Sequence, residues 1–268
     1  MLRKLFTILL FAIIHQSCEE QFEWSLQGGS TDLIIVEAVM TNENRNHLIK
    51  LTRPHQEQNQ PTQPVTGALV VINTKNGVIP TIEYPVGSGS YYTDSIRFVS
   101  NIEYRLSIQH NGKTYFATAN QPGVEPLPTE SPYREVENDL YTLKFSESGE
   151  AANYIKYFVY WQHLGNCAEI NDCQAKIIHY DLKNVDVNKQ FKPNQERVDF
   201  PAGTIIIRIK YSVSDAYREY LRGMLSETAW RGGAFDVFPA NAYTNLSAGA
   251  VGFFAVSTVV TDTTIVAP

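Results

Sequence analysis

The sequence has little positive charge and no long apolar run, and each shortage argues against a class of protein. Lys and Arg number 22 against 28 Asp and Glu, which gives a formal net charge of −6. Nucleic-acid-binding proteins normally carry a basic stripe, so we predict no nucleic-acid partner. The apolar run Leu5–Ile14 has ten residues, whereas a membrane-spanning helix needs about 20.

Complete catalytic, phosphate-binding and metal-binding signatures are also missing. The stretch GSGS at 87–90 departs from the G-x-S-x-G pattern of a serine nucleophile, and no helix is predicted after it. The stretch GAVGFF at 249–254 lacks the third glycine of a dinucleotide-binding loop. We expect its glycines to allow close approach of another backbone or a bulge. We therefore predict no catalytic residue, no cofactor, no bound metal and a non-enzymatic role.

The N-terminus is the most informative segment that is present. Residues 1–17 have the layout of a secretory signal, with a positive start, the apolar centre Leu5–Ile14 and the small residue Ser17 before the predicted cut. Cys18 would then begin the mature chain. Its thiol can carry a diacylglycerol thioether, and two or more acyl chains hold a protein stably at a bilayer. We therefore predict that acylated Cys18 anchors the chain to a lipid bilayer.

This segment resembles a bacterial lipoprotein signal, with one departure. His15 stands three residues before the cysteine, where the usual motif favours an aliphatic residue. The alternative is a conventional signal followed by an incidental cysteine. The predicted tether, residues 18–31, begins with the acidic stretch EEQFE. This stretch resembles the signal that exports Bacteroidota lipoproteins to the outer face of the outer membrane, and a solvated linker is the alternative.

The other two cysteines, Cys167 and Cys173, lie six positions apart. An exported chain meets an oxidising compartment, so we predict a disulfide that pins a hairpin tip. The alternative is a zinc site formed with His163 and His179. Zinc prefers four ligands in a tetrahedron, but this spacing matches no common zinc finger.

Residues 32–120 read as a series of short strands. Alternating polar and apolar residues in HLIKLTR fit a half-buried strand. Asn76-Gly77 and Asn111-Gly112 each separate two extended runs, and Asn-Gly favours a type I′ hairpin turn. Seven short strands at this spacing predict an immunoglobulin-like β-sandwich. Residues 121–132 are rich in proline, which resists both helix and central strand, so we predict a linker there.

Residues 133–268 are predicted to form a larger β-rich domain, a sheet or barrel, that carries one amphipathic helix near 214–230. Ser214 is the predicted N-cap of that helix, and Gly232-Gly233 its end. The apolar residues within it recur every three or four positions and form one face. They are Tyr217, Tyr220, Leu221, Met224 and Leu225.

Aromatic residues are the best binding candidates. In an extended strand Tyr154, Phe158 and Tyr160 share one face, and Tyr157 and Trp161 share the other. One set would pack into a core, and the other would be free to stack on a sugar or fill a partner's pocket. The candidate binding aromatics are Tyr157, Trp161, Trp230 and Phe235, and core packing is the alternative for each.

Taken in order, several stretches resemble one family of Bacteroidota outer-membrane lipoproteins, the domain of unknown function 4249. The resemblance spans nearly the whole mature chain, and the order of the pieces carries it. They are the cysteine followed by EE, LIIVEAVMT leading into HLIKLTR, VTGALVVI, GSYYTD, EYRLSIQHNGKTYFA, NYIKYFVYW, the Tyr-rich helix and NLSAGAVGFFAV.

That family is similar in genetic setting to accessory lipoproteins of TonB-dependent outer-membrane receptors. The resemblance therefore implies a lipid-anchored outer-membrane protein, exposed at the cell surface, that helps such a receptor to capture or transport a nutrient. It supplies no catalytic residues. The alternatives are a surface adhesin or structural interaction module, and an uncharacterised hydrolase whose active-site groups converge only in the fold.

Overall fold

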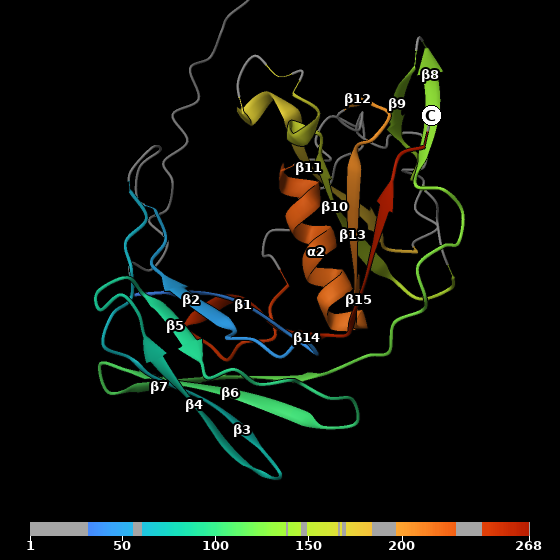
Figure 1. Cartoon of the computed structure of the whole chain (residues 1–268). Coiled ribbons are helices and arrows are strands. Elements are labelled where there is room, and N and C mark those ends of the chain that lie inside the picture. The colour runs from blue at the N-terminus through green and yellow to red at the C-terminus, as the bar shows by residue number, and fades with distance from the viewer. Residues whose placement is uncertain are drawn as a thin grey trace, which may run out of the picture. The chain divides into compact units, whose positions relative to one another are not determined.

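The computed structural model describes residues 32–55, 61–137, 139–145, 149–165, 167, 170–183, 197–228 and 243–267. This part of the chain is mainly β, as predicted, and it contains one α-helix, α2 (Asp215–Thr228) (Figure 1). Its strands form sheets of eight, four and three strands.

The eight-stranded sheet, which we call the barrel sheet, contains all seven strands of residues 32–120 and one strand from near the C-terminus. Its strands, in spatial order, are β14 (Ala250–Ser257), β1 (Ile34–Thr41), β2 (Leu48–Thr52), β5 (Ser90–Thr93), β4 (Gly77–Glu83), β3 (Leu69–Thr74), β6 (Glu103–His110) and β7 (Lys113–Asn120). Strand β14 pairs with β1 in parallel, and the other pairs are antiparallel. The predicted N-terminal domain thus shares its sheet with a strand from the predicted C-terminal domain.

The two outer strands of the barrel sheet, β14 and β7, approach each other and nearly close it. The segment before β14 bridges to β7 at Leu246 and Ala117. The side-chain amide of Asn245 donates to the carbonyl oxygens of Thr118 at 3.0 Å and of Phe254 at 2.8 Å. The Asn245 side chain therefore links the two edge strands. Backbone carbonyl groups that would be unpaired at an open edge are hydrogen-bonded here.

Both predicted hairpins are present, but only one of them turns at its Asn-Gly pair. The β6–β7 turn has positive φ at Asn111 (48°) and Gly112 (74°), as a type I′ turn requires. The β3–β4 hairpin differs from the prediction by one position. Its two-residue turn is Lys75-Asn76, because Gly77 already pairs with Thr74 as the first residue of β4.

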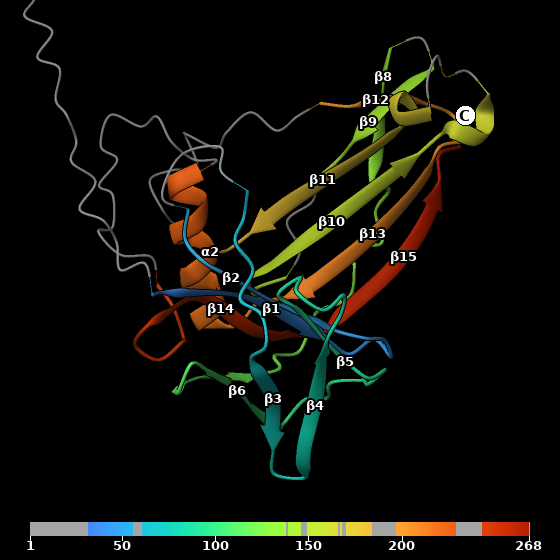
Figure 2. The ribbon, with the colours of Figure 1, turned by 90° about the vertical axis from the view of Figure 1, so that its left-hand side faces the viewer.

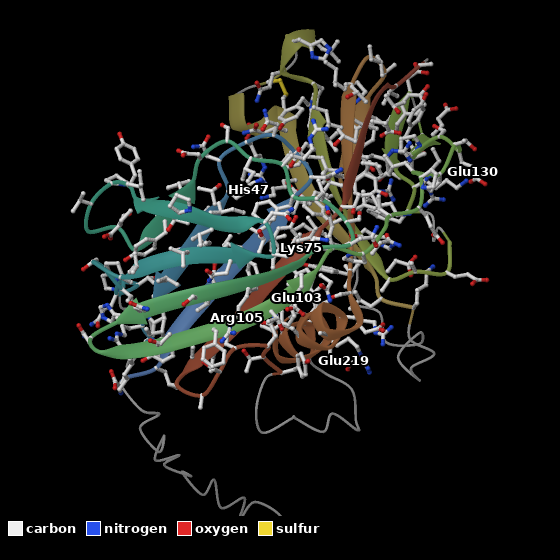
Figure 3. All side chains as sticks on the ribbon, turned by 90° about the horizontal axis from the view of Figure 1, so that it is seen from below. His47, Lys75, Glu103, Arg105, Glu130 and Glu219 are labelled. Carbon is white, nitrogen blue, oxygen red and sulfur yellow. A yellow bond between two sulfur atoms is a disulfide. The ribbon has the colours of Figure 1, made fainter. Side chains whose placement is uncertain are left out.

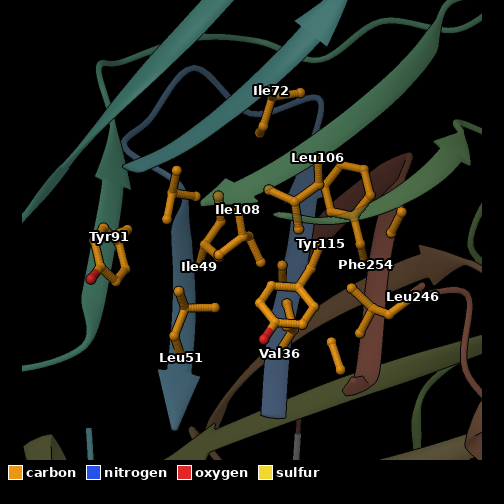
Figure 4. Packing of buried hydrophobic residues seen from close by; sticks show 14 of the residues in the cluster. Val36, Ile49, Leu51, Ile72, Tyr91, Leu106, Ile108, Tyr115, Leu246 and Phe254 are labelled. Carbon is orange, nitrogen blue, oxygen red and sulfur yellow. The ribbon is translucent and has the colours of Figure 1, made fainter. Parts of the chain in front are cut away.

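The interior of the barrel sheet is filled by side chains from all its strands, several of which are labelled in Figure 4. Strand alternation explains which residues are buried, because every second residue of β1 and β6 points inward. The labelled residues are Val36, Ile49, Leu51, Ile72, Tyr91, Leu106, Ile108, Tyr115, Leu246 and Phe254. Fully burying a large apolar side chain contributes about 1.5–3 kcal/mol, so this cluster dominates the stability of the sheet.

The four-stranded sheet is antiparallel and appears broadside in Figure 2. In spatial order it contains β11 (Gln174–Asp181), β10 (Asn153–Tyr160), β13 (Ile205–Ser212) and β15 (Val259–Ile265). One face packs on the three-stranded sheet of β12 (Asp199–Pro201), β9 (Leu140–Leu143) and β8 (Tyr133–Glu137). Their shared core includes Ile155, Tyr157, Val159, Phe200 and Ile206.

A single residue, Thr258, carries the chain from the barrel sheet into the four-stranded sheet. Its N–H donates to Ser212 Oγ at 2.8 Å, and its carbonyl accepts from the Ser212 N–H at 2.9 Å. Asn42, just after β1, accepts from the Val259 N–H at 2.8 Å. Because both sheets contribute to this junction, it fixes how β14 leads into β15.

Helix α2 confirms the predicted amphipathic helix. The Tyr217 N–H donates to the Ser214 hydroxyl at 3.2 Å, so Ser214 is the N-cap. The predicted apolar face packs inward, with Tyr217, Leu221 and Leu225 buried against strands β10, β13 and β14. The predicted end at Gly232-Gly233 lies outside the described residues.

Candidate functional site

The face of the four-stranded sheet that turns away from β8, β9 and β12 is apolar and largely uncovered by other described residues. We call it the open sheet face. Directly paired residues of an antiparallel sheet share a face, so the register defines its members. They are Lys156, Phe158 and Tyr160 on β10; Lys176 and Ile178 on β11; Ile205, Ile207 and Ile209 on β13; and Thr261, Thr263 and Ile265 on β15.

All of these side chains are half-buried or exposed. Ile265 is 64% exposed and Ile178 is 37% exposed. An antiparallel sheet with one solvated face normally carries polar residues there, whereas this face is rich in isoleucine and aromatic residues. A contiguous exposed apolar surface of this kind marks a candidate interaction site.

Helix α2 covers one end of the same face (Figure 2). Under the helix, the rings of Tyr154 and Tyr211 stack with centroids 4.6 Å apart, and Tyr217 stacks on Phe253 at 5.0 Å. Burial raises the pKa of Tyr154 and of Tyr217, so both phenols stay neutral. The stacked tyrosines therefore border the open sheet face at its helix end.

Two lysines give the open sheet face a positive charge. The Lys156 ammonium lies over the Tyr211 ring at 4.6 Å, and that of Lys176 lies 5.7 Å from the Phe158 ring. Burial lowers the pKa of Lys156, and the charges of Lys176 and Arg45 lower it further. Neither lysine forms a salt bridge with an acidic residue in the part of the chain that the structure describes. The Glu43 carboxylate acts on Lys156 in the opposite direction and raises its pKa. Lys176, which is exposed, is therefore the more accessible of the two lysines to a partner's carboxylate.

The structure places Tyr157 on the opposite face, in the core. Its side chain is 1% exposed, and burial raises its pKa to about 12. Trp161 is half-buried at the end of β10 and packs against the same core, with its ring 6.3 Å from that of Phe200. In the other predicted set, Phe158 and Tyr160 are half-buried, whereas Tyr154 is buried under helix α2. Cys18, Trp230 and Phe235 lie outside the described residues.

Cys167 and Cys173 form a disulfide, with Cα atoms 5.9 Å apart (Figure 3). They lie between η1 (Gln162–Leu164) and the end of η2 (Ile170–Cys173), next to the hairpin of β10 and β11. The two histidines of the zinc alternative point elsewhere. His163 Nε2 donates to the Gly203 carbonyl at 3.0 Å, and His179 stacks on Phe145 at 4.9 Å. Among the described residues, no three acidic, His or Cys side chains gather as metal ligands would.

Replacing Cys167 and Cys173 together by serine should lower the free energy of unfolding by about 2 kcal/mol, because the short loop gains entropy in the unfolded chain. Urea unfolding with and without a reductant measures this effect. The matched treatment is a metal chelator, which should leave the unfolding midpoint unchanged. A midpoint that falls with chelator and not with reductant would contradict the disulfide and favour the zinc alternative.

The predicted linker contains a feature that the sequence did not reveal. Residues 121–128, which we call the proline strap, run along β13 and are held by side-chain donors. Lys210 Nζ donates to the Pro126 carbonyl at 3.2 Å, and Arg208 Nη2 donates to that of Pro128 at 3.3 Å. Ser212 Oγ donates to the Pro122 carbonyl at 3.0 Å.

The period-two run of Arg208, Lys210 and Ser212 inside an apolar strand was a signal for this contact. The alternate isoleucines of that strand were likewise a signal for the open sheet face. Under the strap, a small depression beside Lys210 and Asn153 has no room for a water molecule. It is therefore not a ligand pocket, and the open sheet face remains the main candidate site.

Comparison with known protein families assigns the chain to one of them. A family model for a domain of unknown function, DUF4249, matches residues 19–263, which is most of the chain. The chain belongs to the DUF4249 family. This confirms the resemblance to the domain of unknown function 4249 that the sequence indicated. No curated protein matches this DUF4249 chain. The helix in its described residues is too short and too polar to cross a membrane.

Proposed function

We propose that this DUF4249 chain is a lipid-anchored, non-enzymatic accessory of a TonB-dependent outer-membrane receptor, and that the open sheet face contacts the receptor. The observation that carries the proposal is the combination of apolar side chains with Lys156 and Lys176 on one solvated sheet face. It suits a protein partner that presents apolar residues beside carboxylates. The receptor itself is inferred from the predicted anchor at Cys18 and from the family resemblance.

The proposed location is the outer membrane, with acylated Cys18 as the anchor and the chain displayed at the cell surface. Mass spectrometry of the mature N-terminus tests the anchor, and an unmodified Cys18 would contradict it. The immunoglobulin-like sandwich for residues 32–120 and the division of the chain at 121–132 also stay predictions. The strands of that segment lie in one nearly closed sheet with β14.

Pull-down from detergent-solubilised membranes tests the receptor contact. Lys176→Glu places a negative charge on the open sheet face and should reduce recovery of the receptor by about tenfold or more, because like charges would then face each other. Lys75→Glu makes the same change at the exposed β3–β4 turn and serves as the matched control with unchanged recovery.

Two results would count against the proposal. Recovery of the unaltered chain without any TonB-dependent receptor would overturn the accessory role. Equal recovery by the unaltered chain and both variants would show that the contact lies elsewhere. A circular-dichroism spectrum of each variant confirms that the fold is retained.

A further inference from the structure

The end of β4 and the turn that follows it present an unusual run of exposed apolar side chains. Ile82 is 70% exposed, Tyr84 is 71% exposed and Val86 is 89% exposed. These are the three most exposed large apolar side chains in the described part of the chain, and they alternate within one short segment. We call residues 82–86 the apolar tip. Single exposed apolar residues are ordinary, but a cluster of this kind indicates a surface for an apolar partner.

The apolar tip is held in place by Glu83, whose carboxylate lies inside the turn. Its Oε1 accepts the N–H groups of Gly87 at 3.1 Å and Gly89 at 2.9 Å, and its Oε2 accepts that of Gly67 at 3.0 Å. Desolvation raises the pKa of Glu83, but the three N–H donors outweigh it and leave the pKa below its usual value. The tip is therefore preorganised, which reduces the entropy lost on binding.

The tip lies at the end of the barrel sheet where β1 begins (Figure 1). The Leu51 N–H donates to the Gly89 carbonyl at 2.8 Å, and Leu51 pairs with Val36 near the start of β1. Asp32, the first described residue, forms ion pairs with Arg53 and Lys113 at the same end. The chain thus enters the barrel sheet next to the apolar tip.

The length of the preceding segment limits how far this end can be from the anchor. Residues 19–31 separate Cys18 from Asp32. An extended chain covers about 3.3–3.6 Å per residue, so a lipid on Cys18 keeps Asp32 within about 50 Å of the bilayer. An anchor attached at this end favours orientations in which the same end faces the lipid.

We propose that the apolar tip inserts into the headgroup region of the phospholipid bilayer to which the chain is anchored. The inference rests on the proposed lipid anchor at Cys18. Tyrosine suits this role, because its ring is apolar and its hydroxyl stays hydrated at a membrane interface. The tip would be a second, reversible attachment that sets the orientation of the barrel sheet on the membrane.

Tryptophan quenching tests the insertion directly. The full lipidated chain is reconstituted into vesicles of phosphatidylethanolamine and phosphatidylglycerol with brominated acyl chains, which quench nearby tryptophan. The emission that Tyr84→Trp adds to that of the unaltered chain should be quenched and shifted to shorter wavelength. Val78→Trp is the matched control, because Val78 is 59% exposed on the same strand but lies beside the opposite turn, which contains Lys75 (Figure 3). Its added emission should not be quenched.

The outcomes separate this inference from the proposed function. If the chain floats with the vesicles but Tyr84→Trp is not quenched, or both variants are quenched equally, the insertion is overturned and the anchor is retained. If the chain does not float and mass spectrometry finds Cys18 unmodified, the anchor fails and the insertion fails with it. Unaltered circular-dichroism spectra establish that both variants are folded.

Discussion

Gly252→Ala should destabilise the chain by at least about 3 kcal/mol, measured by urea unfolding. Gly252 lies in β14 directly opposite Val36 of β1, and its φ is 96°. A Cβ there would lie 2.1 Å from the Val36 carbonyl oxygen. The substitution therefore adds both an unfavourable backbone conformation and a clash with backbone that cannot move without breaking the β1–β14 pairing. The close approach expected for the glycines of GAVGFF is confirmed at this position.

Gly223→Ala is the matched control, because it makes the same chemical change with the opposite expected sign. Gly223 lies inside helix α2, and a Cβ there would meet nothing within 4 Å. Alanine is favoured over glycine in helix interiors, so this variant should gain about 0.5–1 kcal/mol. Equal destabilisation by the two substitutions would contradict the described β1–β14 register.

Asp262→Asn should lower the free energy of unfolding by about 3 kcal/mol, because it leaves the buried guanidinium of Arg208 without its counter-ion. Arg208 is 5% exposed, and its guanidinium pairs with both carboxylate oxygens of Asp262. Arg208 also donates to the Pro128 carbonyl, so the ion pair supports the proline strap. Limited proteolysis should therefore cut within the strap faster in this variant.

Asp199→Asn removes a comparable carboxylate from an exposed pair and serves as the control. Asp199 pairs with Arg197 at 2.9 Å, and 59% of the Arg197 side chain is exposed. Exposed ion pairs contribute about 0–1 kcal/mol, so the loss should be correspondingly small. If Asp262→Asn cost no more than Asp199→Asn, the burial of the Arg208 pair would have no energetic consequence.

Local features of the fold were predictable because their signals lie within a few residues. Helix α2 follows from its apolar spacing and Ser214, and the β6–β7 turn follows from Asn111-Gly112. The pairing of β1 with β14 was not predictable, because a parallel pair between strands so distant in sequence has no local turn signal. The only sequence signal for this pairing was Gly252, which indicated a close backbone approach but not which strand makes it.

Part of the candidate site was predictable: the sequence shows which residues of β10 share a face, but not which face is covered. Alternation along β10 separates Tyr157 from Phe158, but it does not say which face is covered. The elements that decide this, α2 and the strands β8, β9 and β12, lie elsewhere in the sequence. The choice of Tyr157 as a binding aromatic rested on this missing information.

The position of β14 also has a consequence for biogenesis. The first strand of the barrel sheet finds its parallel neighbour only within the last segment of the chain. Contacts so distant in sequence form slowly, since the intervening chain must first be brought together. A chain that emerges N-terminus first would therefore hold β1 without its parallel neighbour until β14 has followed.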